Sequence, residues 1–125
     1  MTDRELLELA AKAYWGDEID DVVSVEWSEP DQGIAYTHGE NQDHNGNDVT
    51  LIWNPLEDDG GALRLAVKLR MDVNFNATDV CAFPEDGRDG AAEAVYVADP
   101  YAATRRAIVR AAAQIGMSHN VVSEG

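Results

Sequence analysis

The order of its predicted elements assigns this 125-residue chain to the α+β class. Capped segments with helical periodicity stand at both ends and in the middle of the chain. Two groups of three β-branched or alternating runs lie between them. Strands in runs, separated by helices, favour an antiparallel sheet covered by helices. The predicted order is α-β-β-β-α-β-β-β-α.

Two helices are predicted before residue 75. The first spans residues 3–15, because Thr2–Glu5 has the form of a capping box and Gly16 follows the last apolar residue. The second runs from about 59 to 70 and is opened by Asp58 or Asp59. Its apolar residues leave only a narrow polar edge, so we expect it to be the central buried helix.

The last helix has the clearest boundaries. Asp99 is a suitable N-cap, Pro100 fits the first helical position, and Gly116 is expected to end the helix as a left-handed C-cap. Arg106 and Arg110 lie opposite the predicted apolar stripe. That stripe comprises Tyr101, Thr104, Ile108, Ala111, Ala112 and Ile115.

The β-branched and alternating runs predict six strands. Asn45-Gly46 readily forms a tight turn, so the runs on either side of it should pair antiparallel. The predicted strands cover residues 22–27, 34–37, 49–53, 72–76, 80–83 and 94–98.

Length and composition predict a single domain over residues 1–116, followed by a flexible tail at 117–125. No segment approaches the roughly 20 apolar residues that span a bilayer, and the charged N-terminus does not look like a signal peptide. The single cysteine, Cys81, cannot form an internal disulfide and is expected in the core. These features predict a cytoplasmic protein.

The charge is strongly acidic. The chain has 24 Asp and Glu against 9 Lys and Arg, a net charge of −15. Phosphate binding needs clustered Lys and Arg, so we expect neither direct nucleic-acid binding nor a membrane surface as partner. The acidity either confers solubility alone or imitates a polyanion.

No pattern predicts catalysis or a bound cofactor. Nucleophile elbows, phosphate-cradling loops and zinc-protease motifs are missing, so we predict no enzyme and no catalytic residue. The segment Asp43–Asp48 fails the calcium-loop pattern, since the sixth position is Asp48 and the twelfth is Asn54. His38 and His44 lie on one polar loop without a rigid frame, so no metal site is predicted either.

Three residues are candidates for an interaction with another protein. Trp15 falls opposite the apolar stripe of the first helix, and lies either at an interface or against the following loop. Arg106 and Arg110 should be exposed, one helical turn apart. They either temper the negative field as solvated residues or mark a face that docks an acidic partner.

Two segments carry a resemblance to known proteins, Trp53–Leu69 and Asp99–Ala112. They resemble small phage and prophage proteins of the phage ABA sandwich domain family, and more distantly the phage NinX group. The resemblance implies an α/β/α sandwich and a phage source, hence a bacterial host cell. It implies no catalytic residues, and residues 17–48 have no counterpart in the pattern.

Three hypotheses of function follow. The first is a small non-enzymatic phage accessory protein that binds a host or phage protein. The alternative is an acidic mimic of nucleic acid that inhibits a defence or nucleic-acid-binding protein. The second alternative is a domain that binds a small ligand beside the sheet. Partner and oligomeric state stay open.

Overall fold

The computed structural model describes residues 1–95 and 99–124, with side chains as far as residue 118. It confirms the α+β class and the predicted order of elements, with one short 3₁₀ turn, η1, added after the first helix. The elements are α1 (Asp3–Trp15), η1 (Gly16–Glu18), β1 (Val23–Ser28), β2 (Gly33–Gln42), β3 (Asp48–Trp53), α2 (Asp59–Lys68), β4 (Asp72–Phe75), β5 (Asp79–Phe83), β6 (Ala91–Ala94) and α3 (Pro100–Glu124).

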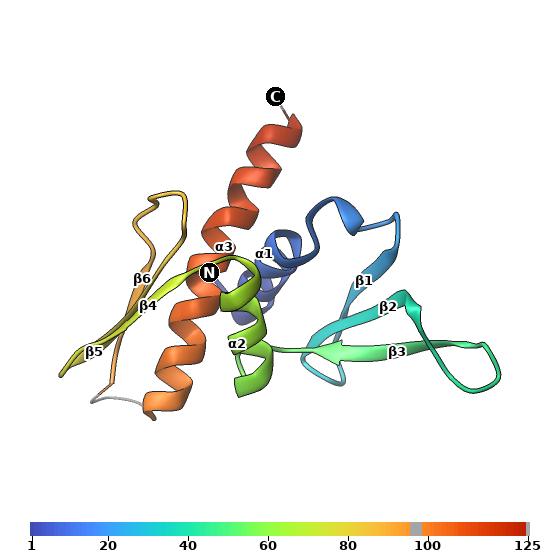
Figure 1. Cartoon of the computed structure of the whole chain (residues 1–125), viewed down its shortest axis with the longest axis horizontal. Helices are drawn as coiled ribbons and strands as arrows, with labels where there is room; N and C mark the ends of the chain where they lie inside the picture. The colour runs from blue at the N-terminus through green and yellow to red at the C-terminus, as the bar shows by residue number, and fades with distance from the viewer. Residues whose placement is uncertain (96–98, 125) are drawn as a thin grey trace.

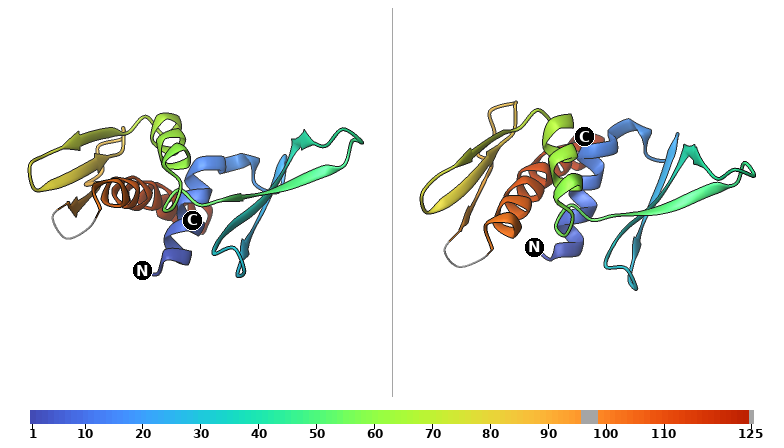
Figure 2. Two further views of the ribbon diagram at one scale, coloured as in Figure 1. Left: turned by 90° about the horizontal axis from the view of Figure 1, so that it is seen from below. Right: turned by 60° about the horizontal axis from the view of Figure 1, so that its bottom comes forward.

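The layering differs from the expected arrangement. The strands form two separate antiparallel sheets, β1-β2-β3 and β4-β5-β6, instead of one. The helices lie between the sheets, so the layers run sheet, helices, sheet (Figures 1 and 2). Each run of three strands pairs within itself, because antiparallel neighbours can be joined by short hairpin connections.

The hairpin of the first sheet forms where the sequence predicts it. β2 and β3 pair antiparallel, and Gly46 takes a positive φ of 83° in the turn. The Asp43 carboxylate accepts hydrogen bonds from the backbone N–H groups of Asn45 and Asn47, at 2.8 and 3.0 Å. These bonds hold the turn, and the hairpin projects from the body of the molecule (Figure 1).

The first helix begins and ends as predicted. Thr2 and Glu5 form the reciprocal capping box, and Gly16 is the C-cap. The buried face of α1 packs mainly on α3 and on the first sheet. This face joins one sheet to the central helix.

The end of the last helix was predicted wrongly. Gly116 does not cap α3, which continues to Glu124. A Cβ at Gly116 would lie 2.7 Å from the carbonyl carbon of Leu9 and closer still to its oxygen. The glycine therefore permits the close crossing of α1 and α3 and is a packing residue. Flexibility of residues 117–125 stays a prediction.

The prediction for α2 is only partly confirmed. Asp58 is its N-cap and accepts from the Gly61 N–H at 2.9 Å, and Leu65 is fully buried. Leu63 and Val67, however, are 63% and 69% exposed. The helix therefore buries one face, and α3 is the central helix because it contacts both α1 and the second sheet.

The second sheet packs on α3 through β5. Val80 and Ala82 are fully buried, whereas Cys81 points to the opposite face and is partly exposed. Alternation along a strand makes this unavoidable, so placing Cys81 in the core was wrong. The last strand covers 91–94 instead of 94–98, and residues 96–98 lie outside the described part of the chain.

The N-terminus of α3 matches the sequence prediction. Asp99 accepts a hydrogen bond from the Tyr101 N–H at 3.0 Å, with Pro100 as the first helical residue. Tyr101 itself is exposed, because the buried stripe begins only at Ala103. No helix in the described part of the chain is long and apolar enough to span a membrane.

Candidate functional site

Trp15 is a core residue and not an interaction residue. Its side chain is 6% exposed, at the end of α1. Its ring lies 4.9 Å from Tyr36 and 5.1 Å from both Tyr14 and Trp53, measured between centroids. This aromatic cluster fixes the first sheet to α1. Of the two alternatives for Trp15, its burial and ring contacts favour packing within the chain over an interface.

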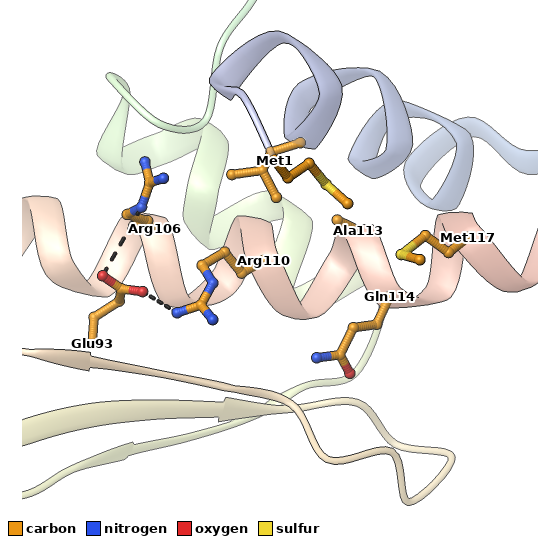
Figure 3. Close-up of a pocket in the computed structure, with 8 residues that line it drawn as sticks. Met1, Glu93, Arg106, Arg110, Ala113, Gln114 and Met117 are labelled. Carbon is orange, nitrogen blue, oxygen red and sulfur yellow. Dashed lines mark hydrogen bonds and ion pairs between the residues drawn. The ribbon is translucent and has the colours of Figure 1, made fainter.

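Arg106 and Arg110 line a polar pocket of about 500 Å³ between α3, the N-terminus and β6 (Figure 3). The Arg110 guanidinium points toward Glu93 of β6, whereas Arg106 faces Glu93 only through its Nε. Arg106 reaches Glu93 at 4.0 Å and Asp3 at 3.0 Å. Arg110 pairs with the other oxygen of Glu93 and donates to the Ala92 carbonyl at 3.1 Å.

Ion pairs within the chain engage both arginines of this polar pocket. Two arginines face two carboxylates, and the arginine side chains are 39% and 42% exposed. Both arginines were expected to be exposed, and they are partly exposed because Glu93 of the neighbouring strand lies beside them. The arginines join α3 to β6 and to α1. These contacts favour the interpretation that the arginines balance charge within the molecule over the interpretation that they dock an acidic partner.

An apolar groove lies between α2, β4 and the start of α3. Its volume is about 470 Å³. Its floor contains the small buried residues Ala62 and Ala66. Its rim carries Leu63, Phe75 and Tyr101, which are 63%, 73% and 69% exposed. Val67 follows Leu63 by one turn of α2 and extends this exposed apolar surface, which we call the α2–β4–α3 groove.

The charges beside the groove are already paired. Arg105, whose side chain is 15% exposed, donates to the Leu56 carbonyl at 2.7 Å and to Asp59 at 2.6 Å. Arg64 pairs with Asp58 at 3.5 Å. Among the lining residues, the Asp59 carboxylate is paired with Arg105 and the Thr104 hydroxyl donates to the Pro100 carbonyl. The groove can therefore receive apolar side chains. A binding partner does not have to supply a charge, because the charged residues beside the groove are paired within the chain.

Sequence reasoning did not find the groove. The signal was present in α2, which is apolar at positions 63, 65, 66, 67 and 69 and so carries more apolar surface than one face can bury. In β4, alternation places Val73 and Phe75 on the same face. Which surplus face stays uncovered depends on how the second sheet packs, and local patterns do not contain that information.

The acidic charge is concentrated in one part of the molecule. Residues 13–63 contain thirteen of the 24 acids and no Lys or Arg. The remaining residues carry eleven acids against all nine bases. The first sheet, η1 and their loops, residues 16–56, therefore form an anionic lobe with ten acids. Residues 72–94, which contain the second sheet, carry six acids and one Arg, and most of the bases lie in the helices.

His38 lies in a shallow polar pocket of this anionic lobe. Its Nδ1 accepts a hydrogen bond from the Glu40 N–H at 3.1 Å, and its Nε2 lies 3.8 Å from Glu18. No group of three His, Cys, Asp or Glu side chains within the described residues could hold a metal ion. His44 is in the hairpin turn and exposed, so the two histidines are not brought together.

Comparisons with protein-family models, with curated proteins and with solved structures find no match. The class that the fold and site define is thus an α+β protein with two sheets around a helical layer, an exposed apolar groove and an anionic lobe. The resemblance to the phage ABA sandwich domain family stays a prediction. The layering observed here, with sheets outside and helices inside, is the reverse of the sandwich which that resemblance implies.

Proposed function

We propose that this protein acts without catalysis, by binding another protein through the α2–β4–α3 groove. One observation carries the proposal: Leu63, Phe75 and Tyr101 surround a single apolar groove while each is more than 60% exposed. Water-exposed apolar patches that surround a pocket are characteristic of protein–protein contacts. Aromatic residues beside such a pocket contribute most of the binding energy in many interfaces.

The expected occupant is an apolar, uncharged segment of the partner. The charged residues beside the groove, Arg105 and Arg64, are satisfied by Asp59 and Asp58 and have no need of a second partner. Small residues on the floor leave room for one or two large side chains. The role of a phage accessory protein is part of the same proposal, and its support is the resemblance of the two segments described above.

The test compares two double variants in capture from host lysate. Leu63→Ser with Phe75→Ser removes the groove rim. Val22→Ser with Met117→Ser is the matched control, because both residues are exposed and neither lines the groove. All these side chains are exposed, so both variants should keep the melting temperature of the wild type. The groove variant should lose a stoichiometric partner that the control retains.

The partner is then purified and its affinity measured. We expect the groove variant to weaken binding by about tenfold or more, the effect of losing an interface hot spot. Equal affinity of both variants, or no stoichiometric partner at all, would overturn the proposal. Saturation of the groove by a small apolar compound, with no protein partner, would instead favour a ligand-binding domain.

The anionic lobe favours a second candidate function, mimicry of nucleic acid. Thirteen acids without a single Lys or Arg over residues 13–63 create a negative field on one side of the molecule. Such a surface can occupy a basic groove in place of phosphates. If this is the function, duplex DNA displaces the captured partner and the groove variant still binds it. Failure of DNA to compete would reject mimicry.

A further inference from the structure

The free edge of β3 is the longest uncovered strand edge in the described part of the chain. β3 lies at the border of the first sheet, and among the described residues it pairs only with β2. Among the described residues, no backbone hydrogen bond outside that ladder involves residues 48–53. In an antiparallel strand, alternate residues direct their N–H and C=O groups away from the partner strand. A row of unpaired donors and acceptors therefore faces solvent along β3.

The other strand edges are shorter or partly covered. The start of the β1 edge is covered by residues 19 and 20. Ile19 forms a bridge with Val23, and the Asp20 N–H donates to the Val23 carbonyl at 2.8 Å. On β6, the Arg110 side chain occupies one backbone acceptor, because it donates to the Ala92 carbonyl. β4 has only four residues. The chain thus blocks or shortens these edges and leaves β3 open.

β3 also lacks the features that normally prevent pairing. Edge strands are commonly protected by inward charges, by proline or by a bulge in the edge itself. Here the only charged residue is Asp48, at the first position. Leu51 and Ile52 are both exposed. Because neighbouring residues point to opposite faces, an added strand would find apolar contacts on both faces of the sheet.

Charge determines what can pair with this edge. The anionic lobe around β3 carries ten acids and no Lys or Arg over residues 16–56. A second copy would bring the same charge to the same edge, and the two lobes would repel each other. An extended segment with Lys or Arg side chains would instead be attracted, and its backbone would complete the ladder.

We propose that the free edge of β3 binds an extended, Lys- or Arg-bearing segment of a partner protein as a fourth strand of the first sheet. This surface is separate from the α2–β4–α3 groove, and the proposal does not depend on it. Backbone pairing supplies the register, Leu51 and Ile52 supply apolar contacts, and the anionic lobe selects basic side chains.

The probe is an N-acetylated, C-amidated peptide that alternates Lys with Val or Thr, titrated into the full chain at low salt. The control peptide has Glu at every Lys position. We expect the Lys peptide to bind at least about tenfold more tightly, and to weaken about tenfold or more when the ionic strength shortens the Debye length to about 3 Å. Hydrogen exchange of the bound complex should show new protection at alternate amides of β3.

Two proline variants test the edge itself. Thr50→Pro and Leu51→Pro lie at adjacent positions, so one of them removes an outward N–H and the other removes a donor to β2. Proline is tolerated in an edge strand where its missing N–H faces solvent. The variant that keeps the wild-type melting temperature should lose binding of the Lys peptide by about tenfold or more, because it removes a donor from the new ladder.

Ile52→Lys is a further test of the edge. The variant should fold, since the side chain is exposed, and should weaken binding of the Lys peptide through charge repulsion and lost apolar contact.

The groove variant, Leu63→Ser with Phe75→Ser, should bind the peptide like the wild type, so the two proposals fail separately. Equal binding of both peptides, or exchange protection spread over the anionic lobe with none in β3, would overturn the proposal. A dimer formed through β3 without peptide would also overturn it.

Discussion

Gly116 of α3 lies directly against the backbone of Leu9 in α1. A Cβ at position 116 would be 2.7 Å from the Leu9 carbonyl carbon, a distance that real Cβ atoms essentially never show, and 3.1 Å from the Leu9 Cα. The two helices therefore cross at a point where only a glycine fits. This contact sets the spacing of the helical layer on which both sheets pack.

Gly116→Ala should destabilise the protein by about 1–3 kcal/mol, the usual cost of overpacking a close contact. The alanine would favour the helix locally, so any loss of stability comes from the crossing with α1. Chemical unfolding of the two proteins measures the difference. Gly39→Ala is the control, because an added methyl group there would meet nothing closer than the Val22 carbonyl oxygen at 3.9 Å. Equal stability of the Gly116 variant and the wild type would show that α1 moves away at little cost.

Leu65→Asp should prevent folding, because it places an unpaired carboxylate in the core at a cost of several kcal/mol. Leu63→Asp, two residues away on the exposed face of α2, should leave the melting temperature almost unchanged. Circular dichroism during heating distinguishes the two. A cooperative transition at the wild-type temperature in the Leu65 variant would contradict the burial of this face.

The cluster of Arg106, Arg110 and Glu93 should show coupled energetics. Arg106→Gln with Arg110→Gln should lower the free energy of unfolding by at most about 1 kcal/mol per pair, reduced by screening because the arginines are partly exposed. Adding Glu93→Gln to that variant should cost little more, since the partners are already gone. Urea unfolding of the four combinations gives the coupling. Strict additivity would show that the ion pairs contribute nothing to stability.

The hairpin turn should lose stability in acid because of Asp43. Hydrogen bonds from the backbone N–H groups of Asn47 and Asn45 hold the pKa of the Asp43 carboxyl below its usual range. A folded-state pKa that is lower than the unfolded one gives stability above the unfolded pKa. That stability is lost as the pH falls through the folded value, below about pH 4.

Melting temperatures of the wild type and Asp43→Asn should therefore differ at neutral pH and converge in acid. The comparison isolates Asp43 from the other acids, which titrate equally in both proteins. A difference that stays constant from neutral pH to below pH 3 would mean that the ionised carboxylate does not hold the turn.

The patterns that predicted the elements correctly are local ones. The capping box at Thr2 and Glu5, the N-caps at Asp58 and Asp99, and the turn at Gly46 each depend on hydrogen bonds within a few residues of one another. The fold class and the order of helices and strands follow from such signals. The predictions that were wrong, for Cys81 and Gly116, depend on which distant element packs against them, and so does the burial of Trp15.

The candidate site could not be read from the sequence for the same reason. Leu63 and Phe75 look like core residues in any local pattern, and they are exposed because no element in the described part of the chain packs over that side of α2 and β4. Arg106 and Arg110 look exposed, and Glu93 of β6 reaches them only because the second sheet lies on α3.

The sequence by itself determined the α+β class, the element order and the excess of acid in residues 13–63. Short-range hydrogen bonds, side-chain periodicity and a count of charges are sufficient for these. Tertiary structure alone decided that the strands divide into two sheets around the helices, that Gly116 is a crossing point, and that one apolar groove and the β3 edge stay open. These outcomes depend on packing between segments far apart in the chain, and no local pattern specifies that packing.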